Sequence, residues 1–296
     1  MQSKQQIQQL LSSAGVSVNK RLGQNFLIDL NLMQLLVASA NITCNDIVLE
    51  TGCGTGSLTE ELAEKAGKVI AVEIDTTLAK ITKRQLADRE NVEVINSDVL
   101  ESKNTINHRV IGTIEQARKE YCGRFLLVSN LPYSVAAPVM LSLAAGPTTA
   151  DAMYITIQRE VAQRMAASPG GKHYGILSIL LDATGEVKTE RILKPTVFWP
   201  QPQVDSAMVS FIRSKEKATR IYSMELFREV VNLFMGYRRK MLKACTKLAQ
   251  GRLTEIKNWP QIFELCSVDP HNRPETLSTE DYIAIANLCA EYLNLK

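Results

Sequence analysis

The chain has 296 residues, of which 45% are hydrophobic and 22% charged, and its formal net charge is +3. This length and composition give enough apolar material for a substantial core, in one large domain and a smaller one. No apolar run is long enough to span a bilayer, residues 1–20 have neither a signal-peptide core nor an Arg-rich transit composition, and the six cysteines contain no C-x-x-C pair. We therefore expect no membrane association, no metal site, and a reducing, cytoplasmic compartment.

A glycine-rich turn follows the first strand-like run. Residues 46–49 predict a buried strand, residues 50–59 read Glu-Thr-Gly-Cys-Gly-Thr-Gly-Ser-Leu-Thr, and residues 58–66 predict an amphipathic helix. Glycines at a strand-to-helix turn allow a ligand to approach the backbone, but the spacing is neither the dinucleotide fingerprint nor a P-loop. Glu50 would be awkward beside a pyrophosphate and is compatible with a cationic sulfonium cofactor that carries an amino-acid tail. A glycine-rich connection without a ligand is the alternative.

Two acidic residues follow the next strand-like runs. Residues 69–73 form an apolar run that ends in Glu73, 21 residues after Gly52, close to the offset at which such folds bind ribose hydroxyls. Asp75 could compete for this role or cap the helix that follows it. Asp98 comes after a third strand-like run and could accept from the amino group of an adenine. Taken singly, such residues are more often solvated acids at strand ends.

The run Asn130-Leu131-Pro132-Tyr133 follows a fourth apolar run, residues 125–129. The Asn side chain offers a carbonyl acceptor, Pro132 stiffens the turn, and Tyr133 offers an aromatic face for stacking. Two acceptors on the hydrogens of an adenine amine would direct the nitrogen lone pair towards an electrophile. An ordinary strand end with a proline turn is the alternative.

Strand-like and helix-like segments alternate from residue 47 to residue 212, which predicts an α/β, doubly wound, Rossmann-like sheet. The late strand candidates 187–193 and 207–212 lack a long helix between them, as in an antiparallel edge. Ligands bind at the carboxyl ends of strands in open α/β sheets. The glycine turn, the two acids and the Asn-Leu-Pro-Tyr run are therefore expected to meet in one crevice.

The C-terminal part of the chain has a different pattern. Residues 214–218 form a polar linker, and helical periodicity follows in residues 226–248, 261–266 and 279–293. We therefore divide the chain into a catalytic domain, residues 1–214, with an N-terminal helical extension, and an all-helical domain, residues 215–296.

The net positive charge lies in this C-terminal part. From Ser214 onward there are 13 basic and 10 acidic residues, whereas the first 213 residues have 21 of each. Between Glu229 and Glu255 there is no acid, and the bases are Arg238, Arg239, Lys240, Lys243, Lys247 and Arg252. Arg239, Lys243 and Lys247 have the i, i+4, i+8 spacing of one helix face. A solvated helix face is the default interpretation, but the absence of acids favours an RNA-binding surface.

In this order, these features resemble S-adenosylmethionine-dependent methyltransferases, and specifically the small-subunit ribosomal RNA adenine dimethyltransferases of the KsgA type. The resemblance covers nearly the whole chain, and the combination of motifs is far more specific than the glycine turn alone. Further matching blocks are residues 20–27, 158–162, 169–178, 202–207, 237–240 and 273–278. Ser134 stands where the family would have Asn, and Leu22 stands where Phe is commoner.

The resemblance implies S-adenosylmethionine as the cofactor. Gly52 would meet its amino-acid part, Glu73 its ribose and Asp98 its adenine. The full set of implied cofactor-binding residues is Asn25, Leu27, Gly52, Gly54, Glu73, Asp98 and Asn130.

The resemblance also implies a catalytic set, Asn130, Leu131, Pro132, Tyr133 and Phe198. Asn130 would touch both the cofactor and the target amine, and the Leu131 carbonyl would be the second acceptor. Tyr133 would stack on the target adenine, with Phe198 close to the same base.

The implied reaction is the transfer of two methyl groups to each of two adjacent adenosines in a hairpin near the 3′ end of small-subunit rRNA. The partner would be an assembling small ribosomal subunit, bound through Arg238, Arg239, Lys240, Lys243 and Lys247, and we expect a monomer. A DNA adenine N6-methyltransferase and a large-subunit rRNA adenine methyltransferase that confers antibiotic resistance are alternatives, against which the C-terminal blocks argue. A non-catalytic RNA-binding or assembly factor is a third, against which the intact motif set argues.

Overall fold

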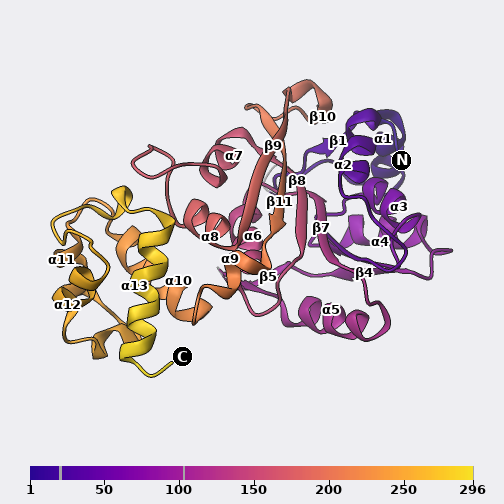
Figure 1. Ribbon diagram of the computed structural model, residues 1–296. Coiled ribbons are helices and arrows are strands. Elements are labelled where there is room, and N and C mark those ends of the chain that lie inside the picture. The colour runs from indigo at the N-terminus through magenta and orange to yellow at the C-terminus, as the bar shows by residue number, and fades with distance from the viewer. Residues whose placement is uncertain (20–21, 103, 296) are drawn as a thin grey trace. The chain divides into compact units, whose positions relative to one another are not determined.

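The computed structural model describes residues 1–19, 22–102 and 104–295 (Figure 1). Lys20 and Arg21, which begin the first of the matching blocks, lie outside the described residues. The chain forms two compact units. Unit 1 comprises Met1–Leu143, Thr148–Ala162 and Lys188–Ile212, and unit 2 comprises Ala144–Pro147, Gln163–Val187 and Arg213–Lys296.

Unit 1 is built on a seven-stranded sheet with the order β4-β3-β2-β7-β8-β11-β9. Its strands are β2 (Ile47–Thr51), β3 (Lys68–Glu73), β4 (Val92–Asn96), β7 (Phe125–Asn130), β8 (Ala152–Gln158), β9 (Gly185–Leu193) and β11 (Ser206–Arg213). Strands β4, β3, β2, β7 and β8 are parallel to one another. Strand β11 runs antiparallel to β8, and β9 forms the edge. This arrangement confirms the predicted doubly wound α/β sheet.

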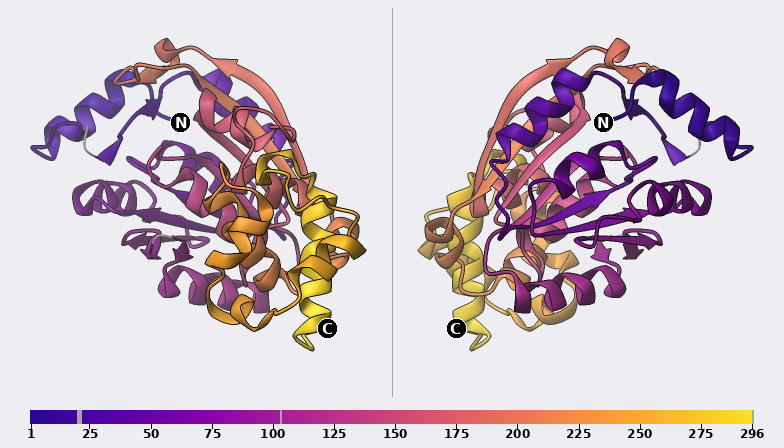
Figure 2. Two further views of the ribbon diagram at one scale, coloured as in Figure 1. Left: turned by 90° about the vertical axis from the view of Figure 1, so that its left-hand side faces the viewer. Right: turned by 90° about the vertical axis from the view of Figure 1, so that its right-hand side faces the viewer.

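Helices cover both faces of this sheet because its central strands carry apolar side chains on both faces. Val48, Val69 and Leu126 are fully buried in one cluster with side chains of α2 and α3. Helix α5 contacts β2 and β3, and Figure 2 shows it on the face opposite to α2. The helices of this part of the chain are α1 (Lys4–Ser13), α2 (Leu30–Ser39), α3 (Ser57–Ala63), α4 (Thr76–Gln85), α5 (His108–Glu120), α6 (Ala136–Ala145) and α7 (Arg159–Met165).

Two short antiparallel pairs complete unit 1. Strand β1 (Phe26–Leu27) pairs with β10 (Phe198–Trp199), and β5 (Leu100–Ser102) pairs with β6 (Thr105–Ile106). The first pair joins the N-terminal segment to residues 198–199, which are far away in the sequence.

Unit 2 is helical, and the described residues 214–295 contain only helices and connecting loops. Its helices are α8 (Ile176–Thr184), α9 (Lys215–Thr219), α10 (Met224–Gly236), α11 (Leu242–Cys245), α12 (Trp259–Leu265) and α13 (Thr279–Tyr292), with 3-10 turns at Thr246–Leu248, Gly251–Glu255 and Pro274–Thr276. Phe234 lies at the centre of the core and contacts the rings of Trp259, Phe263 and Tyr282. None of the helices in the described ranges is long and apolar enough to cross a membrane.

Unit 2 also includes residues 163–187, which lie before the predicted domain boundary at residue 214. Helix α8 is buried at nearly every position and packs against α10 and α13. Within the same unit, the Tyr174 hydroxyl donates to the Leu277 carbonyl at 2.9 Å. The compact units therefore differ from the predicted boundary in this segment.

The helix predicted over residues 226–248 is interrupted, which corrects the sequence prediction. Helix α10 ends at Gly236, a turn follows, and α11 begins only at Leu242. The interruption is stabilised by a neighbouring loop, because the Leu242 amide donates to the Asn272 carbonyl and the Lys243 amide to the Pro270 carbonyl. Glycine is also a poor residue for continuing a helix. Arg239 therefore lies in the turn, and the predicted stripe along one helix face does not form.

Candidate functional site

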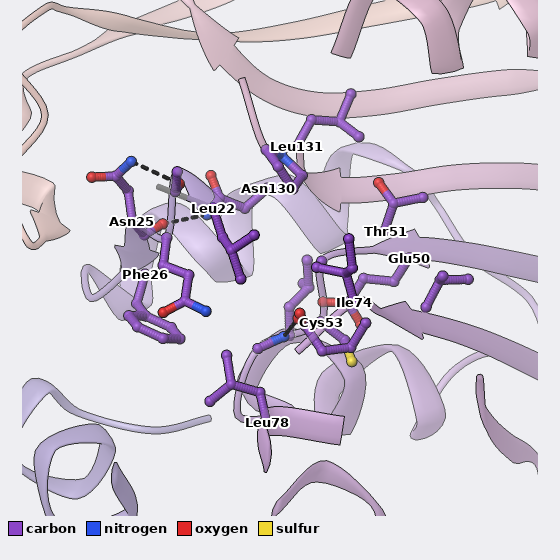
Figure 3. Close-up of a pocket in the computed structure, with 18 of the residues that line it drawn as sticks. Leu22, Asn25, Phe26, Glu50, Thr51, Cys53, Ile74, Leu78, Asn130 and Leu131 are labelled. Atoms are coloured by element: carbon purple, nitrogen blue, oxygen red, sulfur yellow. Dashed lines mark hydrogen bonds between the residues drawn. The ribbon is translucent and has the colours of Figure 1, made fainter. Parts of the chain in front are cut away.

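A cavity in unit 1 lies at the carboxyl ends of β2, β3, β4 and β7 (Figure 3). Its volume is about 200 Å³, far more than one ordered water needs, so it has room for a ligand. Ten of the predicted site residues line it, namely Asn25, Leu27, Gly52, Gly54, Glu73, Asp98, Asn130, Leu131, Pro132 and Tyr133. The motifs that follow one another along the sequence therefore lie together in one crevice, as predicted.

The conformation of the glycine turn requires residues without a side chain at Gly52 and Gly54. Gly52 and Gly54 have φ values of 74° and 61°, in the left-handed region that other residues rarely adopt. A Cβ on Gly52 would lie 2.7 Å from Pro132 Cγ, and one on Gly54 would lie 2.9 Å from Phe26 Cε1. The first contact brings the glycine turn against the Asn-Leu-Pro-Tyr run.

Two buried carboxylates face this cavity. Glu50 is 3% exposed and accepts a hydrogen bond from the Thr59 hydroxyl at 2.7 Å. Burial raises the pKa of Glu50 to about 8, with a further contribution from the neighbouring Glu73. Glu73 accepts from the amides of Gly54 at 2.8 Å and Asp75 at 2.9 Å, and burial raises its pKa as well. A carboxylate has about four acceptor sites, so Glu73 can still accept from a ligand.

Asp75 caps α4, which settles one of the alternatives left open by the sequence. Its carboxylate accepts from the amides of Thr77 and Leu78 at 2.8 and 3.1 Å. Asp98 lines the cavity with an exposed side chain, and its Oδ1 accepts from the Leu100 amide at 2.9 Å. Among Glu73, Asp75 and Asp98, the acid that is both buried and held in a fixed orientation at the cavity wall is therefore Glu73.

The Asn130 side chain is held from two sides. Its amide nitrogen donates to the Asn25 carbonyl at 2.7 Å, and its Oδ1 accepts from the Thr156 hydroxyl at 2.6 Å. Figure 3 shows Asn130 beside Asn25 at the cavity wall, with Glu50 on the opposite side. The Tyr133 hydroxyl lies 2.9 Å from Ser206 Oγ, and burial raises the pKa of this phenol.

Phe198 is the one predicted catalytic residue that the structure does not bring to this cavity. Its side chain is 1% exposed and belongs to the core cluster that contains Leu27 and Met208. The physical reason is the pairing of β10 with β1, which directs Phe198 into the core. The next residue, Trp199, stacks on Phe26 at 6.1 Å between ring centroids.

Several cavity residues were missed by the sequence interpretation. Ile74 is 49% exposed at the cavity wall, and Ile7 of α1 and Phe26 line it as well. The Ser97 hydroxyl lines the same cavity and has no hydrogen-bond partner among the described residues. The only signal in the sequence was the apolar residue between Glu73 and Asp75, which is a weak signal for Ile74. The sequence held no signal for Ile7 and Phe26, because long-range packing brings them to the cavity.

The predicted RNA-binding residues lie in unit 2, and their environments differ. Arg238 forms an ion pair with Glu275 at 2.7 Å, so its charge is partly neutralised. Arg239, Lys240, Lys243 and Lys247 are exposed in the turn after α10, in α11 and in the following 3-10 turn. Arg252, the sixth base of this run, forms ion pairs with Glu225 and Glu229.

The chemistry of the lining fits S-adenosylmethionine. A cationic ligand would lower the raised pKa values of Glu50 and Glu73 and favour their ionised forms, whereas a pyrophosphate would be repelled by these forms. The oxygens of both side chains can also accept from the hydroxyl groups of a ligand. A side chain at Gly52 would collide with Pro132, so only glycine lets this turn lie so close to the Asn-Leu-Pro-Tyr run at the cavity wall. The hydroxyl of Ser97 offers a further buried polar group that a ligand can satisfy.

Comparison with solved structures identifies proteins that share this fold. The chain is similar to a dimethyladenosine transferase from Plasmodium falciparum, with a TM-score of 0.64 and 22% identity over 86% of this chain and 94% of that one. It is similar to the 23S rRNA methyltransferase ErmE, with a TM-score of 0.60 and 22% identity over 88% and 98%. The chain therefore has the fold of these two methyltransferases.

Sequence comparison then defines the family. The ribosomal RNA adenine dimethylase family matches residues 15–290, and the chain belongs to this family. Proteins called ribosomal RNA small subunit methyltransferase A are similar to it. The one from Geobacillus sp. is 35% identical over 94% of both chains, and the one from Alkaliphilus oremlandii is 37% identical over 93% of both.

Proposed function

We propose that the chain transfers methyl groups from S-adenosylmethionine to N6 of two adjacent adenosines in a 3′-terminal hairpin of small-subunit rRNA, and dimethylates each. The observation that carries this proposal is the fixed amide of Asn130 at a cavity that also contains Glu50 and Glu73. Family membership supports the adenine as target, and the relatives called ribosomal RNA small subunit methyltransferase A support the small subunit as substrate.

The cofactor-binding part of the proposal uses three groups of this chain. Glu73, held by two backbone amides, accepts from the ribose hydroxyls, and Asp98 accepts from the adenine amine. The glycine turn at Gly52 and Gly54, together with Asn25 and Leu27, surrounds the rest of the cofactor. S-adenosylmethionine supplies an electrophilic sulfonium methyl group when it is bound.

The target-binding part uses the Asn-Leu-Pro-Tyr run. Asn130 Oδ1 and the Leu131 carbonyl accept the two hydrogens of the adenine amine and direct its nitrogen lone pair towards the methyl group. Among the described residues, no hydrogen bond uses the Leu131 carbonyl, so it is available. Pro132 fixes the turn, and the ring of Tyr133 stacks on the base, which must leave its own stack to enter the cavity. The amine releases one proton for each methyl that it gains.

The helical domain, residues 215–296, is proposed to bind RNA as part of an assembling small ribosomal subunit in the cytoplasm. Arg239, Lys240, Lys243 and Lys247 are exposed bases that can contact phosphates. Arg238 would contribute less, because its ion pair with Glu275 must be weakened first. A monomer is proposed, with catalysis in residues 1–214.

A labelled methyl-transfer assay tests the function. The purified protein is incubated with S-adenosylmethionine carrying a labelled methyl group and with unmethylated small subunits, large-subunit RNA or duplex DNA in separate reactions. We expect label only on small subunits, as N6,N6-dimethyladenosine. Label on large-subunit RNA or DNA would support the corresponding alternative, and no label on any substrate would support a non-catalytic assembly factor.

A further inference from the structure

The orientation of the Asn130 amide is determined by the chemistry of its two neighbours. The Asn25 carbonyl can only accept, so the Asn130 atom that faces it at 2.7 Å must be the amide nitrogen. The carbonyl end, Oδ1, must then face Thr156, whose hydroxyl donates to it at 2.6 Å. A flipped amide would place two acceptors against each other at the Asn25 carbonyl.

Thr156 also holds the backbone of the next residue. In the parallel pairing of β7 with β8, Asn130 lies opposite Thr156, and the Leu131 amide donates to the Thr156 carbonyl at 3.1 Å. The two acceptors proposed for the target amine, Asn130 Oδ1 and the Leu131 carbonyl, therefore belong to residues that are both hydrogen-bonded to one residue of β8.

Thr156 is not exposed to the cavity. Its side chain is 1% exposed, and the residue is absent from the cavity lining. It lies between β7 and β11, where Met208 is its partner in the antiparallel register. A β-branched apolar residue would suit this central strand position equally well, so strand formation alone does not account for a hydroxyl here.

We propose that Thr156 is a positioning residue for methyl transfer, which aligns the Asn130 carbonyl with the target amine. This inference rests on the proposed function. The Thr156 hydroxyl occupies one lone pair of Asn130 Oδ1, so that the other lone pair is directed at the cavity and fixed there. Without the hydroxyl, only the Asn25 contact restrains the amide, and its terminal torsion is broad.

Three substitutions separate the hydroxyl from side-chain volume. Thr156→Ser keeps the hydroxyl and loses a methyl group, Thr156→Val keeps the volume and loses the hydroxyl, and Thr156→Ala loses both. We expect the single-turnover rate of methyl transfer to fall about tenfold in the Val and Ala variants and to stay within about twofold of the original in the Ser variant. The Kd for S-adenosylmethionine, measured by calorimetry, should change much less than the rate in all three, because Thr156 does not line the cavity and Glu73 and the glycine turn are unaltered.

The melting temperature of each variant shows whether Thr156 has a purely structural role. In that case the rate would fall in proportion to the loss of stability. If the rate follows the melting temperature instead of the presence of the hydroxyl, or if the Val variant transfers methyl groups at the original rate, the inference is overturned. If the Val variant does not fold, the Ser and Ala variants provide the same comparison. An inactive original chain would contradict the proposed function instead, so the two failures are distinguishable.

Discussion

Asn130 is a residue whose usefulness depends on being fixed before any substrate arrives. Both ends of its amide are hydrogen-bonded to groups on different segments, the Asn25 carbonyl and the Thr156 hydroxyl. Preorganised polar groups contribute to catalysis because they need not be reoriented during the reaction. The sequence predicted Asn130 as an acceptor, but it could not predict Thr156, which is 26 residues away.

Replacing Asn130 with Ala should abolish most methyl transfer and leave cofactor binding nearly intact. The change removes one acceptor for the target amine, so we expect the single-turnover rate to fall about 100-fold or more. The Kd for S-adenosylmethionine should rise much less, because Glu73 and the glycine turn remain. The exposed Asn45 provides a control, as Asn45→Ala should change neither quantity. Near-original turnover in Asn130→Ala would exclude the role assigned to it.

Glu50 should make the stability of the ligand-free protein depend on pH. Its pKa is raised from 4.5 to about 8 in the folded chain by burial. Between these values the unfolded chain loses the proton and the folded chain keeps it, so this contribution to stability is present below pH 4.5 and is lost as the pH rises towards 8. The side chain of the Glu50→Gln variant cannot ionise. The free energy of unfolding of this variant, minus that of the original chain, should therefore be larger at pH 8 than at pH 5.

Urea unfolding without cofactor, at pH 5 and pH 8, measures this difference. The exposed Glu90 provides the matched control, because Glu90→Gln makes the same chemical change outside the cavity. An equal effect of Glu50→Gln at both pH values would mean that Glu50 is ionised in the folded chain.

At the scale of elements, the basic segment after α10 differs most from its prediction. The bases were predicted on one continuous helix, whereas they lie in a turn, in the short α11 and in a 3-10 turn. Gly236 was visible in the sequence as a poor helix former, but the loop carbonyls at Pro270 and Asn272 that hold the broken segment were not. The charges remain exposed, so the predicted RNA-binding surface can be tested.

Reversing three exposed charges, Arg239→Glu, Lys243→Glu and Lys247→Glu, should weaken RNA binding and flatten its salt dependence. Each lost phosphate contact removes up to about one unit from the slope of log K against log salt concentration. Titrations of small-subunit RNA at several salt concentrations measure this slope. The same reversal at Lys65, Lys83 and Arg84 of unit 1 changes the net charge equally and should leave the slope largely unchanged. Equal slopes for the original chain and the first variant would assign these bases to a solvated surface.

At the scale of the whole molecule, local signals predicted the sheet and most of the cavity. Apolar runs gave the strands, glycines gave the turn, and the common direction of parallel strands brought Gly52, Glu73, Asp98 and Asn130 together. Where the structure differs from the expected arrangement, the difference depends on contacts between distant segments. The pairing of β1 with β10 buries Phe198, and the packing of α8 on α10 and α13 assigns residues 163–187 to unit 2.

The assignment of α8 leads to a prediction about truncation. Leu177, Leu180 and Leu181 are at most 7% exposed, and α8 packs against α10 and α13, which a chain ending at residue 214 would lack. Exposing such side chains costs roughly 1.5–3 kcal/mol each. The truncated chain should therefore melt at a lower temperature than the full chain and bind a hydrophobic dye, and Leu177→Ser, Leu180→Ser and Leu181→Ser together should reduce that binding. A truncated chain with the original melting temperature and no dye binding would instead support an independent domain that ends at residue 214.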